Sequence, residues 1–259
     1  MKTIITLTIL MTVTSLWAAD GLGKNIIYKE KNTELEGYIA ETPIKKKSVP
    51  GFLIVHDWMG ISDDNRREAD HLADKGAVAL AVDIYGKGVR PTSNEEAAKT
   101  AGIYKKDRGL LRERIKAAYK LLLENKKVDP KKIVILGYCF GGMTALDLGR
   151  TGADVAGIVS FHGNLDSVEA KDASNIKGKV LILHGAIDPY VPADQVAVFQ
   201  KEMNDAKKDY QLVKYGGAVH SFTNKKAGSD ISKGAAYNPL ADARSRKQFD
   251  LFIAEVLGI

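Results

Sequence analysis

The one cysteine of the chain, Cys139, stands between an apolar run and a helix-compatible run, with Gly137 and Gly141 on either side. This Gly-x-Cys-x-Gly pattern is typical of a nucleophile elbow, in which a reactive side chain stands on a sharp turn from a strand into a helix. The glycines fit because such a turn crowds the backbone. The partial positive charge at the start of the helix favours a thiolate. The pattern predicts a thiol nucleophile, although a lone cysteine can also be a small buried apolar residue.

A thiol nucleophile needs a base and an acid, and two later strand ends supply candidates. Asp188 follows an apolar run at residues 180–183, and His220 follows another at 210–215. Their order along the chain, nucleophile then acid then histidine, is the order of an α/β-hydrolase site. We expect His220 to take the proton of Cys139 or to pair with its thiolate. We expect Asp188 to fix the imidazole tautomer and to stabilise its charged form.

Other residues compete for these roles. Asp188 precedes a proline and could simply start a turn, and Asp166 also follows a predicted strand. His184 precedes the acid, which is the wrong order for this arrangement. The other histidines are expected on a helix surface or packed and hydrogen-bonded at strand ends; they are His71, His56 and His162.

An acyl-transfer reaction also needs donors for the oxyanion. In an elbow of this kind one backbone N–H comes from the residue after the nucleophile, here Phe140. The second comes from a loop after an earlier strand, and Trp58 in the loop at residues 56–60 is the predicted donor. Trp58 could equally be a packing aromatic residue. No sequence feature requires a metal or an organic cofactor.

The elements that must position these residues alternate between strands and helices. Residues 25–30 and 34–40 read as an antiparallel hairpin at a sheet edge. Apolar strands then follow at 51–55, 78–82, 132–136, 155–161, 180–183 and 210–215, separated by helical patterns that include one from 91 to 125 and closed by one at 241–257. This alternation predicts an α/β fold, with a mostly parallel central sheet and helices on both faces. No linker or repeat divides residues 19–259, so we expect a single domain.

The composition is that of a globular protein, because 259 residues with 45% apolar and 27% charged side chains suffice for one sizeable core. The formal charge of +6 comes from scattered lysines, with no basic block and no interleaved aromatic residues. We therefore expect no nucleic-acid partner. One cysteine forms no intramolecular disulfide, so stability must come from the core, and we expect a monomer.

The first 18 residues resemble an export signal. Lys2 gives a positive start, residues 4–16 form an apolar stretch, and residues 16–18 resemble a cleavage motif. The stretch is too short and too polar for a membrane span; a buried N-terminal strand or helix is the alternative. The sequence predicts cleavage of residues 1–18 and a periplasmic or secreted mature protein.

Three motifs resemble those of the dienelactone hydrolase family of α/β-hydrolases: the elbow at residues 137–142, the acid turn at 185–189 and the histidine segment at 220–222. The likeness runs from about residue 36 to the C-terminus. It implies the α/β-hydrolase fold, a Cys-His-Asp triad, and a small ester or lactone as substrate. In that family a carboxylate after the first buried strand helps to activate the thiol. The matching residue is Asp57, where the family usually has a glutamate that is longer by one methylene; Asp57 could also be a loop-surface carboxylate.

Known members of that family grip a substrate carboxylate with arginines, one of them shortly after the catalytic histidine. This chain has Asn224 at that place, followed by Lys225. A lysine is a point charge rather than a bidentate clamp. The candidates for substrate binding are therefore Arg90, Arg108 and Lys225. A non-catalytic or thiol-reactive binding protein on the same fold is the alternative to a hydrolase.

Overall fold

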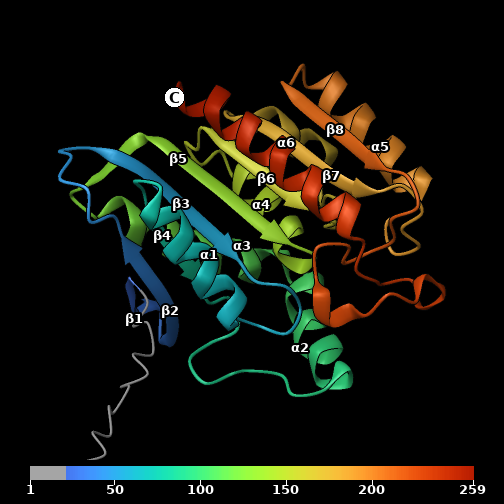
Figure 1. Ribbon diagram of the computed structural model, residues 1–259, viewed down its shortest axis with the longest axis horizontal. Helices are drawn as coiled ribbons and strands as arrows, with labels where there is room; N and C mark the ends of the chain where they lie inside the picture. The colour runs from blue at the N-terminus through green and yellow to red at the C-terminus, as the bar shows by residue number, and fades with distance from the viewer. Residues whose placement is uncertain (1–21) are drawn as a thin grey trace, which may run out of the picture.

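The computed structural model describes residues 22–259, so the predicted export signal lies outside the described part. One eight-stranded sheet runs through it in the order β1-β2-β4-β3-β5-β6-β7-β8 (Figure 1). The hairpin strands β1 and β2 pair antiparallel, β2 also pairs antiparallel with β4, and the other neighbours are parallel. The strands are β1 Gly23–Glu30, β2 Thr33–Glu41, β3 Val49–Val55, β4 Val78–Val82, β5 Val128–Tyr138, β6 Gly157–Phe161, β7 Lys179–Gly185 and β8 Tyr210–Tyr215. The predicted α/β fold and the edge hairpin are confirmed.

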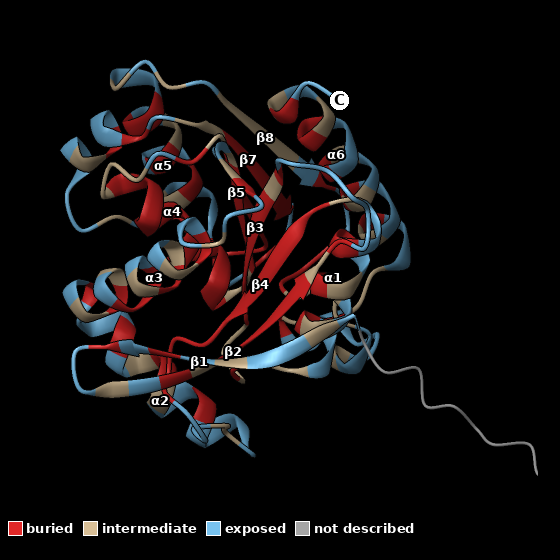
Figure 2. Cartoon of the chain, turned by 90° about the vertical axis from the view of Figure 1, so that its left-hand side faces the viewer, coloured by how far each residue is buried: buried red, intermediate tan, exposed pale blue. Residues whose placement is uncertain are grey.

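Helices cover both faces of the sheet, and the buried residues lie between the layers (Figure 2). Strand β3 shows why: Leu53 and Val55 belong to the core under α3, α4 and α5, whereas Phe52 and Ile54 belong to the core under α1 and α6. The helices are α1 Asp63–Asp74, α2 Asn94–Lys106, α3 Arg108–Leu123, α4 Phe140–Arg150, α5 Ala193–Asp205 and α6 Pro239–Leu257, with short 3₁₀ turns η1 Ala170–Asn175, η2 Lys225–Ala227 and η3 Ile231–Lys233. Within residues 22–259 none of these helices has the length and apolar character that a bilayer crossing requires.

The helical pattern at residues 91–125 forms two helices, so the prediction of one continuous helix is wrong. Asp107 ends α2 by donating its N–H to the Ile103 carbonyl (2.9 Å). The same residue begins α3, because its carboxylate accepts the Leu110 N–H (2.8 Å). A single aspartate thus satisfies groups at the ends of both helices. Apolar spacing alone does not reveal such a break.

The turn from β5 into α4 is as tight as the elbow pattern predicts. Cys139 has φ 54° and ψ −114°, a backbone region that non-glycine residues adopt at a cost of about 1–3 kcal/mol. Its N–H donates to the Phe161 carbonyl (3.0 Å), and its carbonyl accepts the Gly142 N–H (3.0 Å). A Cβ at Gly137 would lie 2.1 Å from the Gly141 carbonyl oxygen, and one at Gly141 would lie 2.3 Å from the Val55 carbonyl oxygen. Only glycine allows these backbones to approach.

We expect Gly141→Ala to destabilise the protein by at least about 1–3 kcal/mol, because the new methyl group meets backbone atoms of β3 that cannot move aside. The matched control is Gly102→Ala inside α2, where an added Cβ meets nothing within 4 Å. That change is expected to stabilise the helix by about 0.5–1 kcal/mol. Urea unfolding of the three proteins measures both effects. Equal midpoints for Gly141→Ala and the unmodified chain would contradict the close approach.

Candidate active site

The structure brings the predicted acid and base together at the carboxyl edge of the sheet. His220 Nδ1 donates to Asp188 Oδ2 at 2.8 Å, and both side chains are buried. The other carboxylate oxygen of Asp188 accepts the Tyr190 N–H (2.8 Å). Because Asp188 occupies Nδ1, the free Nε2 of His220 is left for Cys139. The backbone of His220 is fixed as well, since it exchanges hydrogen bonds with Gly234 (3.1 Å) and Ala236 (3.0 Å).

Three effects act on the pKa of His220, and one of them opposes the other two. Burial disfavours the imidazolium, but the negative charge of Cys139 and the bond to Asp188 outweigh it and raise the pKa of His220 from 6.5 to about 10. The ring is therefore protonated at neutral pH. The imidazolium thus lies next to the sulfur of the half-buried Cys139.

Two rings hold the imidazole of His220 in place. Tyr190 and His162 each meet it edge-on, with ring centroids 5.3 Å away. His162 is itself 2% exposed and bonds through Nε2 to Thr223 Oγ1 (2.8 Å). Burial and the charge of His220 lower the pKa of His162 well below its usual value, so this second ring stays neutral. His162 is therefore packed and hydrogen-bonded, as expected for a histidine at a strand end. The sequence did not predict that its ring lies beside His220.

The predicted oxyanion donors lie at the start of α4 and on the loop after β3. Phe140 is the first residue of α4, and N–H groups in the first turn of a helix have no partner inside the helix. Trp58 follows β3, and its carbonyl accepts the hydroxyl of Tyr85 (3.0 Å), which fixes the orientation of the loop. Trp58 also packs against the core, as the alternative interpretation has it.

Asp57 points into its own loop. Its carboxylate accepts the Met59 N–H at 2.8 Å. Burial raises the pKa of Asp57 in spite of that bond, with a further contribution from the charge of Asp64. Among the described residues no hydrogen bond joins Asp57 to Cys139, so a role in thiol activation stays a prediction.

The neighbouring histidine, His56, has a structural place. Its Nδ1 lies 2.6 Å from the Asp57 carbonyl, and its Nε2 accepts the Ile84 N–H (3.2 Å). The ring thus links the loops that follow β3 and β4. Burial lowers its pKa to about 4, which keeps it neutral. His184, the competing base, is also buried, and burial lowers its pKa.

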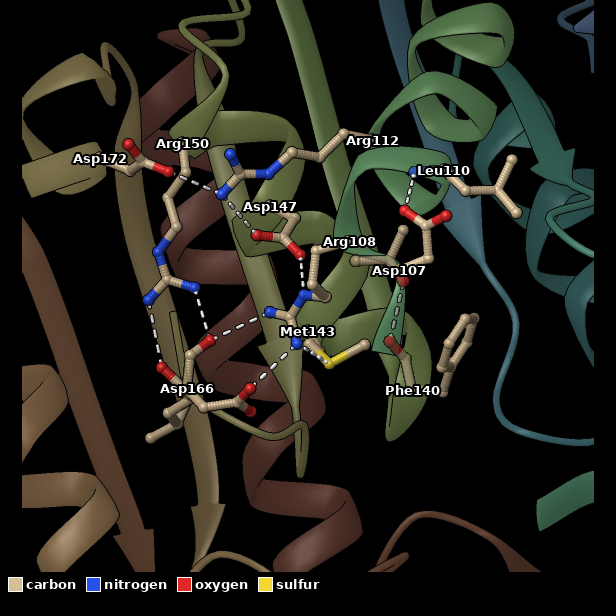
Figure 3. Close-up of polar contacts among 12 residues, drawn as sticks. Asp107, Arg108, Leu110, Arg112, Phe140, Met143, Asp147, Arg150, Asp166 and Asp172 are labelled. Atoms are coloured by element: carbon tan, nitrogen blue, oxygen red, sulfur yellow. Dashed lines mark hydrogen bonds and ion pairs between the residues drawn. The ribbon is translucent and has the colours of Figure 1, made fainter. Parts of the chain in front are cut away.

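Arg108 lies in a buried network of charges beside α4 (Figure 3). Its guanidinium bonds to Asp147 on α4 (2.5 Å) and to the carboxylate of Asp166 (2.9 Å). Arg112 holds the other oxygen of Asp147 (3.2 Å), and Arg150 donates to the Asp166 carbonyl (2.9 Å). These contacts explain Arg108 as a support for α4 rather than a substrate ligand. Because the carboxylate of Asp166 is bonded to Arg108, Asp188 rather than Asp166 is the acid partner of His220.

The two other predicted substrate ligands lie in different settings. Arg90 donates to the carbonyls of Val89 (2.8 Å) and Glu36 (3.3 Å) and pairs with Asp83 (3.5 Å). It therefore fastens the loop after β4. Lys225 is exposed at the start of η2 and lines a cavity together with Ser221, the residue after His220. Among residues 22–259 no cluster of three or more histidine, cysteine or acidic side chains could hold a metal ion.

The sheet order, the elbow and the acid and histidine turns define an α/β-hydrolase. The profile of the Dienelactone hydrolase family matches residues 35–257, and the chain belongs to that family. The solved structure of m3DLH is 33% identical, with a TM-score of 0.86 over 90% of this chain and 98% of its own. A dienelactone hydrolase-like promiscuous phosphotriesterase from metagenomic libraries is 35% identical, with a TM-score of 0.85 and the same coverage. A carboxymethylenebutenolidase homolog of Xenopus tropicalis is 25% identical over 79% of this chain and 84% of its own length. The resemblance drawn from the three motifs is confirmed.

We expect Arg108→Met to lower the free energy of unfolding by about 3 kcal/mol, because Asp147 would remain buried without its closest cation. The KM for ester substrates is expected to stay unchanged. Lys116→Met is the control, since Lys116 pairs with Glu113 on the exposed face of α3 and should cost less than about 1 kcal/mol. A raised KM together with unchanged stability would instead make Arg108 a substrate ligand.

We expect the imidazolium of His220 to stabilise the fold in a pH-dependent way. Its pKa is about 10 in the folded chain and 6.5 for an ordinary histidine. The contribution is therefore complete below about pH 6.5 and is lost as the pH rises through about 10. Thermal unfolding across this range should show that the difference in stability between the unmodified chain and His220→Gln shrinks as the pH rises. A difference that grows with pH would contradict the assigned charge.

Proposed function

We propose that this hydrolase cleaves small carboxylic esters or lactones through a cysteine nucleophile and an acyl-thioester intermediate. The observation that carries the proposal is the imidazole of His220, held by Asp188 on one side and raised in pKa by Cys139 on the other. A charged imidazole beside a lone sulfur at the start of a helix is the arrangement that activates a thiol. The family membership supports the same class of reaction.

In the acylation step the thiolate of Cys139 attacks the carbonyl carbon of the ester. The electron pair of the carbonyl moves to its oxygen, where the N–H groups of Phe140 and Trp58 stabilise the negative charge. The intermediate then collapses, the bond to the alcohol oxygen breaks, and the imidazolium of His220 gives its proton to that oxygen. The products of this step are a free alcohol, a thioester on Cys139 and a neutral imidazole.

Deacylation reverses the roles. The neutral imidazole of His220 removes a proton from water, and the hydroxide formed attacks the thioester. Collapse of the second tetrahedral intermediate expels the thiolate and releases the carboxylic acid. Asp188 holds the ring in one tautomer throughout and stabilises each imidazolium. Burial raises the pKa of Asp57, and we propose that its carboxylate helps to activate the thiol of Cys139 when substrate binds.

We also propose that residues 1–18 direct export and are removed, leaving one hydrolase domain from residue 19. The positive start, the apolar stretch and the small residues after it support this. The proposed enzyme then works as a monomer in the periplasm or outside the cell on a small-molecule substrate. Mass spectrometry of the protein purified from the medium or periplasm gives its N-terminal residue.

The thiol mechanism predicts that iodoacetamide abolishes hydrolysis of p-nitrophenyl acetate and of a lactone panel. Cys139→Ala is expected to lower kcat by about 10³-fold or more, since removal of a triad nucleophile leaves only oxyanion stabilisation and binding. Circular dichroism of the variant provides the folding control.

Two outcomes would contradict the mechanism. One is activity that survives complete alkylation of Cys139; the other is a Cys139→Ala protein as active as the unmodified chain. A folded chain that is alkylated at Cys139 but hydrolyses none of these esters or lactones would favour the thiol-reactive binding protein.

A further inference from the structure

A cavity of about 620 Å³ lies near Cys139 and His220, although neither residue is part of its wall. It lies between the beginnings of α1 and α6 and the segment at residues 221–226. Tyr138 and Ser221, the sequence neighbours of Cys139 and His220, both line it. The volume is within the range of small-molecule sites, roughly 300–1,000 Å³. The cavity is therefore large enough for the part of a substrate that extends away from the reacting bond.

All the residues that line this cavity have polar side chains. Small-molecule sites are usually lined by apolar and aromatic side chains with only a few polar groups. Here every lining residue carries a side-chain nitrogen or oxygen; the residues are Asp57, Ser62, Asp64, Asn65, Arg67, Glu68, Tyr138, His162, Ser221, Thr223, Asn224, Lys225, Lys226, Asp242 and Arg246. The carbon atoms of these side chains leave some apolar surface in the wall, but their polar groups offer many partners to hydroxyl groups.

The formal charges of the wall cancel, since four acidic and four basic residues line it. Most of the bases are already engaged. Arg67 and Lys226 pair with Asp64, and Arg246 pairs with Glu68 at 3.0 Å. Among the described residues Lys225 is the lining base without an ion-pair partner. A single exposed lysine does not make the bidentate grip that selects a carboxylate.

Two buried polar atoms of lining residues lack partners within the described chain. They are the hydroxyl oxygen of Tyr138 and Nδ1 of His162, a residue that is 2% exposed. An unsatisfied buried polar atom costs about 1–3 kcal/mol, so these positions suit a bound group that donates or accepts hydrogen bonds. A hydroxyl group does both.

The position of the cavity assigns it to one side of the ester. His220 hands its proton to the leaving oxygen in the proposed reaction, so the alcohol must lie on the side of His220. The segment directly after His220 contributes Ser221, Thr223, Asn224 and Lys225 to the cavity wall. The cavity thus faces the alcohol part of the substrate.

From these observations we infer that the cavity binds the leaving alcohol, and that this alcohol is uncharged and carries several hydroxyl groups, as in a partial ester of a polyol or a sugar. The inference rests on the proposed esterase function and adds the class of substrate. Carboxylate-bearing lactones do not fit this wall, because its arginines are paired with acids.

Three acetate esters of similar length test this inference: glycerol 1-monoacetate, propyl acetate and 3-acetoxypropanoate. They share the acyl group and differ in hydroxyl groups or a carboxylate on the alcohol. We expect kcat/KM for the glycerol ester to exceed that for propyl acetate about tenfold, as two hydrogen bonds allow. The charged ester is expected to be hydrolysed more slowly than the glycerol ester.

Equal values for the glycerol and propyl esters, or a preference for the carboxylate, would overturn the inference and leave the esterase function intact if p-nitrophenyl acetate is still hydrolysed. Loss of all activity, including that on p-nitrophenyl acetate, would instead refute the proposed function. The two failures are therefore distinguishable.

The variant Tyr138→Phe gives a second, independent readout, because it removes only a hydroxyl that has no partner in the described chain. We expect it to reduce the ratio of kcat/KM for the glycerol ester to that for propyl acetate about threefold or more. Tyr210→Phe is the matched control, since the Tyr210 hydroxyl bonds to Asn204 away from the cavity (3.1 Å), and its ratio should not change. An unchanged ratio in folded Tyr138→Phe would remove Tyr138 from the binding wall.

Discussion

The close approach of backbones around Cys139 is the constraint on which the site depends. Cys139 keeps a positive φ because its N–H is tied to the end of β6 and its carbonyl to Gly142 in α4. Gly137 packs against the backbone of Gly141, and Gly141 packs against the backbone at the end of β3; neither position has room for a Cβ. The sulfur is thereby presented at the edge where the turns after β7 and β8 bring Asp188 and His220. A looser turn would leave the imidazole without its partner.

Charged groups divide into two sets around this elbow, and each set has its own task. Below α4, Asp147 is fully buried and held by Arg108 and Arg112, which fixes the helix whose first turn faces the site. Above the sheet edge, three of the four bases that line the polar cavity are paired with acids near the surface. The first set fixes geometry and the second set leaves the cavity without net charge. The arginines that line this cavity, Arg67 and Arg246, are therefore already paired, although the chain has a formal charge of +6.

The sequence was most informative where function depends on strand ends. Parallel strands end at one edge, so Cys139, Asp188 and His220 could be assigned to that edge from apolar runs and turn residues alone. Arg108 could not be interpreted in this way, because its acidic partners lie 39 and 58 residues further along the chain. The neutral His162 beside His220, and the break at Asp107 inside a continuous apolar pattern, likewise depend on tertiary contacts that local spacing does not contain.

The most direct measurement of the central claim is to trap the covalent intermediate. The protein is mixed with p-nitrophenyl acetate, quenched in acid within the first turnovers, digested and analysed by mass spectrometry. The account predicts one acetyl group on the peptide that contains Cys139, which disappears as turnover ends and accumulates when Asp188→Asn slows deacylation. Product formation with no acetyl group on Cys139 at any time, or an acetyl group on another residue that turns over at the catalytic rate, would contradict it.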